Sequence, residues 1–233
     1  MNNNLLNYFF AVAVSILLAT TSRAQQSDTL RHQVLIETSM GNIRMELYNE
    51  TPRHRDNFLK LVRTGFYDGQ LFHRVIFRFM IQAGDSASHH AQPGQTLGET
   101  VEPYTIPAEI CYPKLFHVRG AVGAAREGDE LNTGRASSSS QFYIVYGTRF
   151  NDEMLDKAQQ RLDKATGGKV KLTPEVREAY KTKGGTPHLD GQYTVFGHVT
   201  DGLDVVDAIQ RVETDKNNRP LEDVRIFRAT IIK

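Results

Sequence analysis

The segment from Tyr67 to Asp85 (YDGQLFHRVIFRFMIQAGD) contains the side chains whose types and spacing best suit chemistry. Arg74 interrupts a strongly apolar run, and a buried arginine is costly unless acceptor groups hold its guanidinium. Gln82 follows in the next strand and offers a carbonyl oxygen. A guanidinium held in this way is a fixed, charged hydrogen-bond donor. The alternative is an arginine at the rim of a barrel with its head in water, and spacing alone does not separate the two.

The sequence lacks the familiar motifs of covalent and metal-dependent catalysis. It contains no G-x-S-x-G and no H-E-x-x-H, and Gly167-Gly168-Lys169 lacks the earlier glycine and the following Ser or Thr of a phosphate-binding loop. His89 and His90 are adjacent, so on an extended chain they point to opposite sides and favour a polar loop over a metal site. The single Cys111 excludes an intrachain disulfide framework and a cysteine-based zinc site. We therefore expect no cofactor and no metal.

The charge balance points away from nucleic acid as a partner. The 233 residues include 28 Lys and Arg and 27 Asp and Glu, for a formal net charge of +1, and 39% of them are hydrophobic. Affinity for DNA or RNA depends on clustered Lys and Arg that face phosphates, and the sequence has no run of this kind. Length and composition fit a water-soluble globular chain of one or two domains that buries a sizeable core.

The amino terminus resembles a secretory signal peptide. Residues Leu5 to Leu18 are almost all apolar, but this stretch is shorter than the roughly 20 residues that span a bilayer as a helix. Ser22-Arg23-Ala24 places small residues where a signal peptidase reads them. We predict a signal peptide over residues 1–24 and a mature domain over residues 25–233, exported to the bacterial periplasm without stable membrane association. The alternative is an uncleaved anchor, because the first residues carry no Lys or Arg.

Alternating apolar and polar residues predict a sheet with one buried face. Val34-Leu35-Ile36 precedes Ile43, Met45 and Leu47, which alternate with polar residues, and a turn at 39–42 joins the two strands. Other strand-like runs follow at Leu71–Ile76, Phe79–Gln82, Phe142–Tyr146, Thr194–Val199 and Val224–Ile232. Many short strands with few helices favour a mainly β barrel or sandwich over alternating β-α units.

Two short helices are expected to cap this sheet. Thr51-Pro52 predicts a helix start with a hydroxyl N-cap and a proline at the first position, and Gly65 ends that helix. A second helix is predicted at about Leu203–Gln210. The serines Ser137–Ser140 are typical of a flexible linker, or else they shape a turn before an apolar strand.

A polar, helix-prone insertion separates the late strands, at about residues 149–187. Asp152–Lys164 places apolar residues at helical spacing, and Thr173-Pro174-Glu175 begins a second helical stretch that runs through Tyr180. The segment contains nine basic and six acidic residues. A solvated insertion is the favoured interpretation, and a surface that contacts a partner is the alternative.

Three blocks of residues, in order, resemble the cyclophilin family of peptidyl-prolyl cis-trans isomerases. The first is Phe72-His73-Arg74-Val75-Ile76 with Phe79-Met80-Ile81-Gln82-Ala83-Gly84-Asp85, and the second is Ser140–Ile144. The third is Leu189–Gly197 followed by Gly202–Val206. The resemblance covers roughly residues 34–232, interrupted by the insertion. It implies a closed eight-stranded antiparallel β-barrel capped by two helices, with a proline-binding groove on its outer face.

The same resemblance implies the residues of the site. Arg74 would donate to the prolyl nitrogen in the twisted transition state, and Gln82 would orient Arg74 and bind substrate backbone. Phe79, Met80, Tyr143 and Leu189 would form the pocket for the proline ring. Ala125, Arg126 and Gln141 would line the subsite for residues before the proline. The partners implied are proline-containing polypeptides, bound by a monomer.

Six positions depart from the family's usual residues. Phe77-Arg78 replaces Pro-Gly, which puts the turn before Phe79 in question. Tyr143 stands where phenylalanine is common, Arg126 where asparagine is common, and Tyr193 where histidine is common, so substrate contacts there are expected to differ. His188 occupies the place of a tryptophan that favours cyclosporin binding, which predicts weak inhibition by that drug.

Three functions compete at this point. The leading hypothesis is an isomerase that accelerates X-Pro isomerisation while exported proteins fold. A catalytically silent cyclophilin-like chaperone or peptide-binding module is the alternative; an Arg74 turned away from the groove, or an insertion lying across it, would favour that module. A carrier barrel of lipocalin type is disfavoured, because cyclophilin-like barrels fill their interior with side chains.

Overall fold

The computed structural model describes residues 30–101 and 103–233, and His32–Lys233 forms one compact unit. The predicted signal peptide over residues 1–24 lies outside the described residues, so it stays a prediction. None of the helices in the described part is long and apolar enough to cross a membrane.

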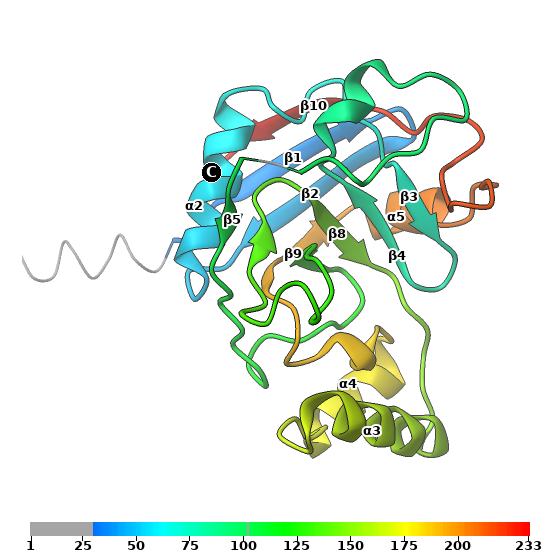
Figure 1. Ribbon diagram of the computed structural model, residues 1–233. Coiled ribbons are helices and arrows are strands. Elements are labelled where there is room, and N and C mark those ends of the chain that lie inside the picture. Colours follow the sequence, from blue (N-terminus) through cyan, green and yellow to red (C-terminus); the bar gives the residue numbers. More distant parts are fainter. Residues whose placement is uncertain (1–29, 102) are drawn as a thin grey trace, which may run out of the picture. The chain divides into compact units, whose positions relative to one another are not determined.

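The core of the molecule is a curled, eight-stranded antiparallel sheet with the order β10-β1-β2-β9-β6-β8-β4-β3 (Figure 1). Its strands are β1 (Gln33–Thr38), β2 (Gly41–Leu47), β3 (Arg74–Ile76), β4 (Met80–Ala83), β6 (Ala121–Ala124), β8 (Phe142–Val145), β9 (Val195–Asp201) and β10 (Ile226–Ile231). A separate two-stranded sheet pairs β5 (Thr105–Ile106) with β7 (Ser137–Ser138). The predicted strands are confirmed, and β6, a short run of small residues, is an addition.

The strand pattern follows the side-chain periodicity of the sequence. In β1 and β2 every second residue is buried, and Val34, Ile36, Ile43, Met45 and Leu47 are inaccessible to solvent. In β4, β6 and β8 every residue is buried, because one face points into the core and the other is covered by neighbouring segments. The candidate site lies on the face that points away from the core.

The expected closure of the barrel is not confirmed. The ladder ends at β10 on one side and β3 on the other, and within the described residues these two strands are not paired. The segments that lead into them are joined by a single bridge between Leu71 and Arg225. Backbone bonds from Phe72 N to Val224 O (2.9 Å) and from Ile226 N to Gln70 O (2.8 Å) support that bridge. The fold is therefore a curled sheet whose edges meet over a few residues.

Two helices pack on this sheet, as the sequence predicts, but one N-cap differs. The helices are α2 (Pro52–Arg63) and α5 (Leu203–Ile209). The Thr51 hydroxyl donates to Tyr48 O at 3.4 Å and accepts no bond from the helix. Instead the carboxylate of Glu109 accepts from the N–H groups of Arg53 (3.1 Å) and His54 (3.0 Å). A residue far along the chain thus caps α2, where a negative charge also suits the helix dipole.

The insertion contains the two predicted helices, α3 (Asp152–Thr166) and α4 (Pro174–Thr182), which lie together next to the 3-10 helix η2 (Pro187–Leu189) (Figure 1). Asn151 caps α3 by accepting from Met154 N at 2.9 Å, and Gly167 ends it in the left-handed conformation at a φ of 60°. The helices share a small core, in which Leu155, Leu162 and Tyr180 are buried. This local core explains why the insertion folds as helices.

Candidate active site

A chain of hydrogen bonds runs from β3 through β4 to Gln141, the residue before β8, and holds Arg74 in place. Arg74 in β3 lies directly opposite Gln82 in β4, and its Nη1 donates to Gln82 Oε1 at 3.0 Å. Gln82 Nε2 donates in turn to Gln141 Oε1 at 2.9 Å, and Gln141 Nε2 donates to Gly98 O at 3.2 Å. The predicted pairing of Arg74 with Gln82 is confirmed, and the arginine with its head free in water is not observed.

Arg74 faces a hollow of about 190 Å³, which we call the Arg74 hollow. Its lining brings together nine of the eleven predicted residues: Arg74, Phe79, Met80, Gln82, Ala125, Arg126, Tyr143, Leu189 and Tyr193. Burial lowers the pKa of the Arg74 guanidinium from its ordinary value. The bond to Gln82 occupies one of the five N–H donors of this side chain, so the arrangement presents a charged donor beside an apolar hollow.

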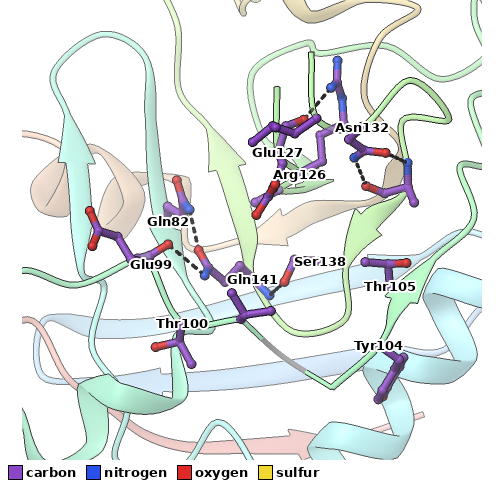
Figure 2. A pocket seen from close by; sticks show the side chains of 15 residues that line it. Gln82, Glu99, Thr100, Tyr104, Thr105, Arg126, Glu127, Asn132, Ser138 and Gln141 are labelled. Atoms are coloured by element: carbon purple, nitrogen blue, oxygen red, sulfur yellow. Dashed lines mark hydrogen bonds between the residues drawn. The ribbon is translucent and has the colours of Figure 1, made fainter. Parts of the chain in front are cut away.

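A larger hollow of about 370 Å³ adjoins the Arg74 hollow (Figure 2). Gln82, Ala125 and Arg126 line both spaces, and Gln141 lines only the larger one, which we call the Gln141 hollow. Figure 2 shows Gln82, Gln141 and Ser138 joined by hydrogen bonds at its inner side. The two hollows together form a continuous surface for more than one residue of an extended polypeptide.

Arg126 builds the wall between these hollows. Its Nε donates to Gln192 O at 2.9 Å, its Nη1 to Glu127 O at 2.7 Å, and its Nη2 pairs with Asp129 at 2.6 Å. The guanidinium also lies over the Tyr193 ring, 4.3 Å from its centroid. Because these contacts occupy all three nitrogens, Arg126 shapes the subsite and offers few donors to a ligand.

A buried network that the sequence did not reveal fixes Tyr143 at the base of the Arg74 hollow. Tyr143 OH bonds to His117 Nε2 at 2.9 Å, and His117 Nδ1 donates to Asp190 Oδ1 at 2.9 Å. Tyr180 of α4 donates to the other oxygen of Asp190 at 2.7 Å. Burial raises the pKa of the Tyr143 hydroxyl well above its ordinary value, so it stays protonated. The network ties the site to the insertion.

Gly123 is required by the same tyrosine. It lies opposite Tyr143 in the pairing of β6 with β8, and a Cβ at this position would come within 2.3 Å of the ring. Such a distance is far below van der Waals contact, so a larger residue would displace the ring. The absence of a side chain at 123 therefore sets the depth of the Arg74 hollow.

Comparison with known proteins identifies the family. A family model described as cyclophilin type peptidyl-prolyl cis-trans isomerase/CLD matches residues 33–231. The chain belongs to the cyclophilin-type peptidyl-prolyl cis-trans isomerases. It is 32% identical over 197 residues to a putative peptidyl-prolyl cis-trans isomerase of Staphylococcus aureus, covering 83% of this chain and 88% of that one.

Other relatives of this cyclophilin-type chain are longer. A putative bifunctional phosphatase/peptidyl-prolyl cis-trans isomerase of Streptococcus pyogenes is 36% identical over 197 residues, which cover 83% of this chain. The chain spans 37% of that protein and 25% of an isomerase of Arabidopsis thaliana, CYP71. Among solved structures, a cyclophilin type isomerase of Cryptosporidium parvum aligns with a TM-score of 0.62 at 24% identity, covering 88% of this chain and 99% of that chain. The last comparison supports the fold.

One predicted site residue of this cyclophilin-type chain lies elsewhere. His188 does not line the Arg74 hollow; its ring packs behind Phe79 at 5.3 Å between centroids and lines a separate hollow with α3. Burial lowers the pKa of His188 from its ordinary value. The side chain therefore supports the Phe79 wall from outside, because η2 turns it toward the insertion.

The turn at Phe77-Arg78 is held by hydrogen bonds from both sides. Phe79 N donates to Ile76 O at 3.0 Å, and Arg78 takes a left-handed φ of 57°. The buried side chain of Gln210 accepts from Arg78 N at 2.8 Å, which holds the turn from α5. The absence of Pro-Gly therefore does not displace Phe79, which lines the Arg74 hollow.

The serine run is ordered, so the linker interpretation is wrong and the turn interpretation is confirmed. Ser137 and Ser138 form β7, and Ser138 Oγ accepts from the N–H groups of Ser140 (3.3 Å) and Gln141 (3.1 Å). Ser137 also bonds to His54 Nε2 at 2.9 Å, while His54 Nδ1 donates to Glu109 at 2.7 Å. This resembles the order of a catalytic triad, but Ser137 is only 1% exposed, so it serves to fix β7.

Proposed function

We propose that this chain accelerates cis-trans isomerisation of X-Pro bonds in exported proteins while they fold, with Arg74 as the catalytic residue. The observation that carries the proposal is the bond from Arg74 to Gln82 beside an apolar hollow of about 190 Å³, a size that suits a proline ring. No lining residue of that hollow, among the described residues, comes from the insertion. Both features favour an enzyme over a silent binding module.

The mechanism needs no bond to be made or broken. The rotational barrier of an amide is about 18–20 kcal/mol, and uncatalysed isomerisation takes about 10–100 s. A turnover of 1–10³ s⁻¹ therefore requires the barrier to fall by roughly 1.4–7 kcal/mol. A positioned charged donor in a site partly shielded from water supplies energies of this size.

Each part of the site has a role in this mechanism. Phe79, Met80, Tyr143 and Leu189 hold the proline ring while the preceding carbonyl rotates. In the twisted state the prolyl nitrogen loses amide resonance and gains a lone pair that accepts a hydrogen bond. Arg74 donates that bond, and Gln82 keeps its guanidinium oriented. Residues before the proline occupy the Gln141 hollow, where Ala125 and Arg126 form the wall.

The test is the cis-to-trans rate of a short X-Pro peptide with the chain and with its Arg74→Ala variant. We expect acceleration by the unchanged chain and a loss of at least tenfold in kcat/KM for the variant. Circular dichroism of both proteins controls for folding. Folded proteins that both leave the rate unchanged would support the chaperone or binding module instead.

We further propose that the mature chain begins at residue 25, is exported to the bacterial periplasm and acts there as a monomer. The support is the apolar segment Leu5–Leu18 followed by Ser22-Arg23-Ala24. Expression of the full chain in a bacterium with two membranes, fractionation and amino-terminal sequencing test this. A protein that starts at Gln25 in the periplasmic fraction and sediments as a monomer is expected, whereas an uncleaved, membrane-bound chain refutes it.

A further inference from the structure

Four arginines surround another hollow, of about 280 Å³, at the end of the sheet where the β3–β4 turn approaches α5. They are Arg78, Arg119, Arg149 and Arg211, and we call this space the four-arginine hollow. Arg211 pairs with Asp207 at 2.8 Å. The other three have no carboxylate within ion-pair distance among residues 30–101 and 103–233. The hollow therefore carries an excess of positive charge that the protein itself does not neutralise.

The backbone at Arg78 indicates that its side chain has a use. The residue has a φ of 57°, a conformation that glycine adopts freely and arginine adopts rarely. Its side chain is exposed, so burial of the stem does not explain the choice. A glycine would satisfy the turn with less strain, and the arginine adds only a guanidinium at the hollow.

Aromatic rings hold the guanidinium groups around this space. Phe77 is 52% exposed, with Arg78 5.4 Å and Arg211 5.6 Å from its centroid. Arg119 lies 4.2 Å from the Tyr146 ring, and its Nε donates to Tyr146 O at 2.9 Å. A guanidinium stacked by its face keeps its N–H edges available, and these edges match a carboxylate.

The four-arginine hollow shares a wall with the Arg74 hollow. The carbonyl of Phe79 accepts from the N–H groups of Tyr146 and Gly147, each at 3.0 Å. Phe79 lines the Arg74 hollow, and Tyr146 and Gly147 line the four-arginine hollow. The Gln141 hollow adjoins the Arg74 hollow at a different part of its lining, at Gln82, Ala125 and Arg126. An extended polypeptide with its proline in the middle thus has a separate surface for each flank.

We propose that the four-arginine hollow binds the carboxylates of acidic residues that follow the proline in the substrate. This rests on the proposed function, in which residues before the proline occupy the Gln141 hollow. Residues after the proline then leave on the other side of the Arg74 hollow, past Phe79. The preferred substrate class is then an X-Pro segment with Asp or Glu on its carboxyl-terminal side. Phosphates of nucleic acid are a poorer match, because three unpaired arginines release few counterions and the chain has a net charge of only +1.

The expected preference is modest and depends on salt. An exposed arginine–carboxylate pair changes an equilibrium by about 1.4- to 5-fold, and salt screens it. Two such pairs predict a kcat/KM about fivefold higher for a peptide with Glu-Glu after the proline than for one with Gln-Gln. The ratio should approach one as sodium chloride rises to about 0.5 M.

The test compares these two peptides with the full chain, two Arg78 variants and a control. Arg78→Gly and Arg78→Asn both tolerate a left-handed backbone, so neither strains the turn. Arg63→Gln removes an exposed arginine from α2 and serves as the control. We expect the Glu-to-Gln ratio to fall by at least half in both Arg78 variants and to stay unchanged in the control.

Two results overturn the proposal and one separates it from the proposed function. A ratio of one at low salt, with the Gln-Gln peptide isomerised, refutes it, and so does a ratio that both Arg78 variants retain. If neither peptide is isomerised, the proposed function fails. The binding of acidic residues by the four-arginine hollow is then tested by the affinities of the two peptides for the chain. Tighter binding of the Glu-Glu peptide, lost in Arg78→Gly, then supports it, and equal affinity overturns it.

Discussion

Acid is expected to weaken the folded state through His73, which lies next to Arg74 in the chain. The side chain is 2% exposed, and neither ring nitrogen has a hydrogen-bond partner among the described residues. Burial lowers the pKa of His73 from 6.5 to about 4, partly opposed by the nearby Asp85 carboxylate. The folded protein therefore holds this histidine neutral at a pH where the unfolded chain takes up a proton.

The sign and size of the effect follow from this difference in pKa. Above pH 6.5 the residue is neutral in both the folded and the unfolded state, so it does not change the free energy of unfolding. As the pH falls from 6.5 toward 4, the unfolded chain binds a proton that the folded chain does not, so stability is lost across this window. At pH 5 the solution lies about 1.5 pH units below the unfolded pKa. Each unit corresponds to about 1.4 kcal/mol, so the free energy of unfolding falls by about 2 kcal/mol.

Urea unfolding at pH 7 and pH 5, with the chain and with a His73→Leu variant, measures this loss. Burial also lowers the pKa of His54 and His188, so part of the pH dependence remains in the variant. The informative quantity is the difference between the two proteins. We expect the variant to lose about 2 kcal/mol less than the unchanged chain between pH 7 and pH 5. Equal losses would refute the assignment to His73.

Three further predictions concern the site and its support. Gln82→Leu removes the acceptor of Arg74, and because a charged hydrogen bond contributes about 1.5–3 kcal/mol, kcat/KM in the peptide assay should fall at least tenfold without loss of fold; an unchanged rate would contradict the positioning role. Tyr180→Phe leaves a buried oxygen of Asp190 without its donor and should lower the free energy of unfolding in urea by about 1–3 kcal/mol, whereas a neutral variant would argue against the network. Cyclosporin should inhibit peptide isomerisation weakly because His188 faces away from the Arg74 hollow, and complete inhibition below micromolar concentrations would show this reasoning to be wrong.

The parts of the fold that the sequence predicts are those with local causes. The helices α3 and α4 follow from the apolar spacing within Asp152–Lys164 and from the helix start at Thr173-Pro174, and each of these signals lies inside or next to its own helix. The first hairpin follows from strict alternation. By contrast β6 contains only small residues and a glycine, and its burial depends on neighbours far along the chain.

In the candidate site, too, contacts between distant residues are the part that the sequence does not predict. A charge in an apolar run marks Arg74 as unusual, but spacing alone does not separate a held guanidinium from one at the rim, and the resemblance to the family supplies the pairing with Gln82. Glu109, which caps α2, bonds to residues 55 and 56 positions away, and Asp190 bonds to His117, 73 positions away, so no local pattern reveals either contact. The resemblance gives the place of His188 in the chain, but it does not reveal that the ring packs against Phe79 and lines the hollow beside α3.

The bond between Tyr180 and Asp190 has a consequence for the ancestry of the insertion. Residues 149–187 form a helical cassette, since α3 and α4 pack around a small core of their own. A shorter relative without this cassette would lack the Tyr180 hydroxyl, and Asp190 would lose the donor to its second oxygen. We therefore expect relatives that lack the cassette to differ at the position of Asp190 or to supply a substitute donor. The insertion and the base of the Arg74 hollow are expected to have been inherited together.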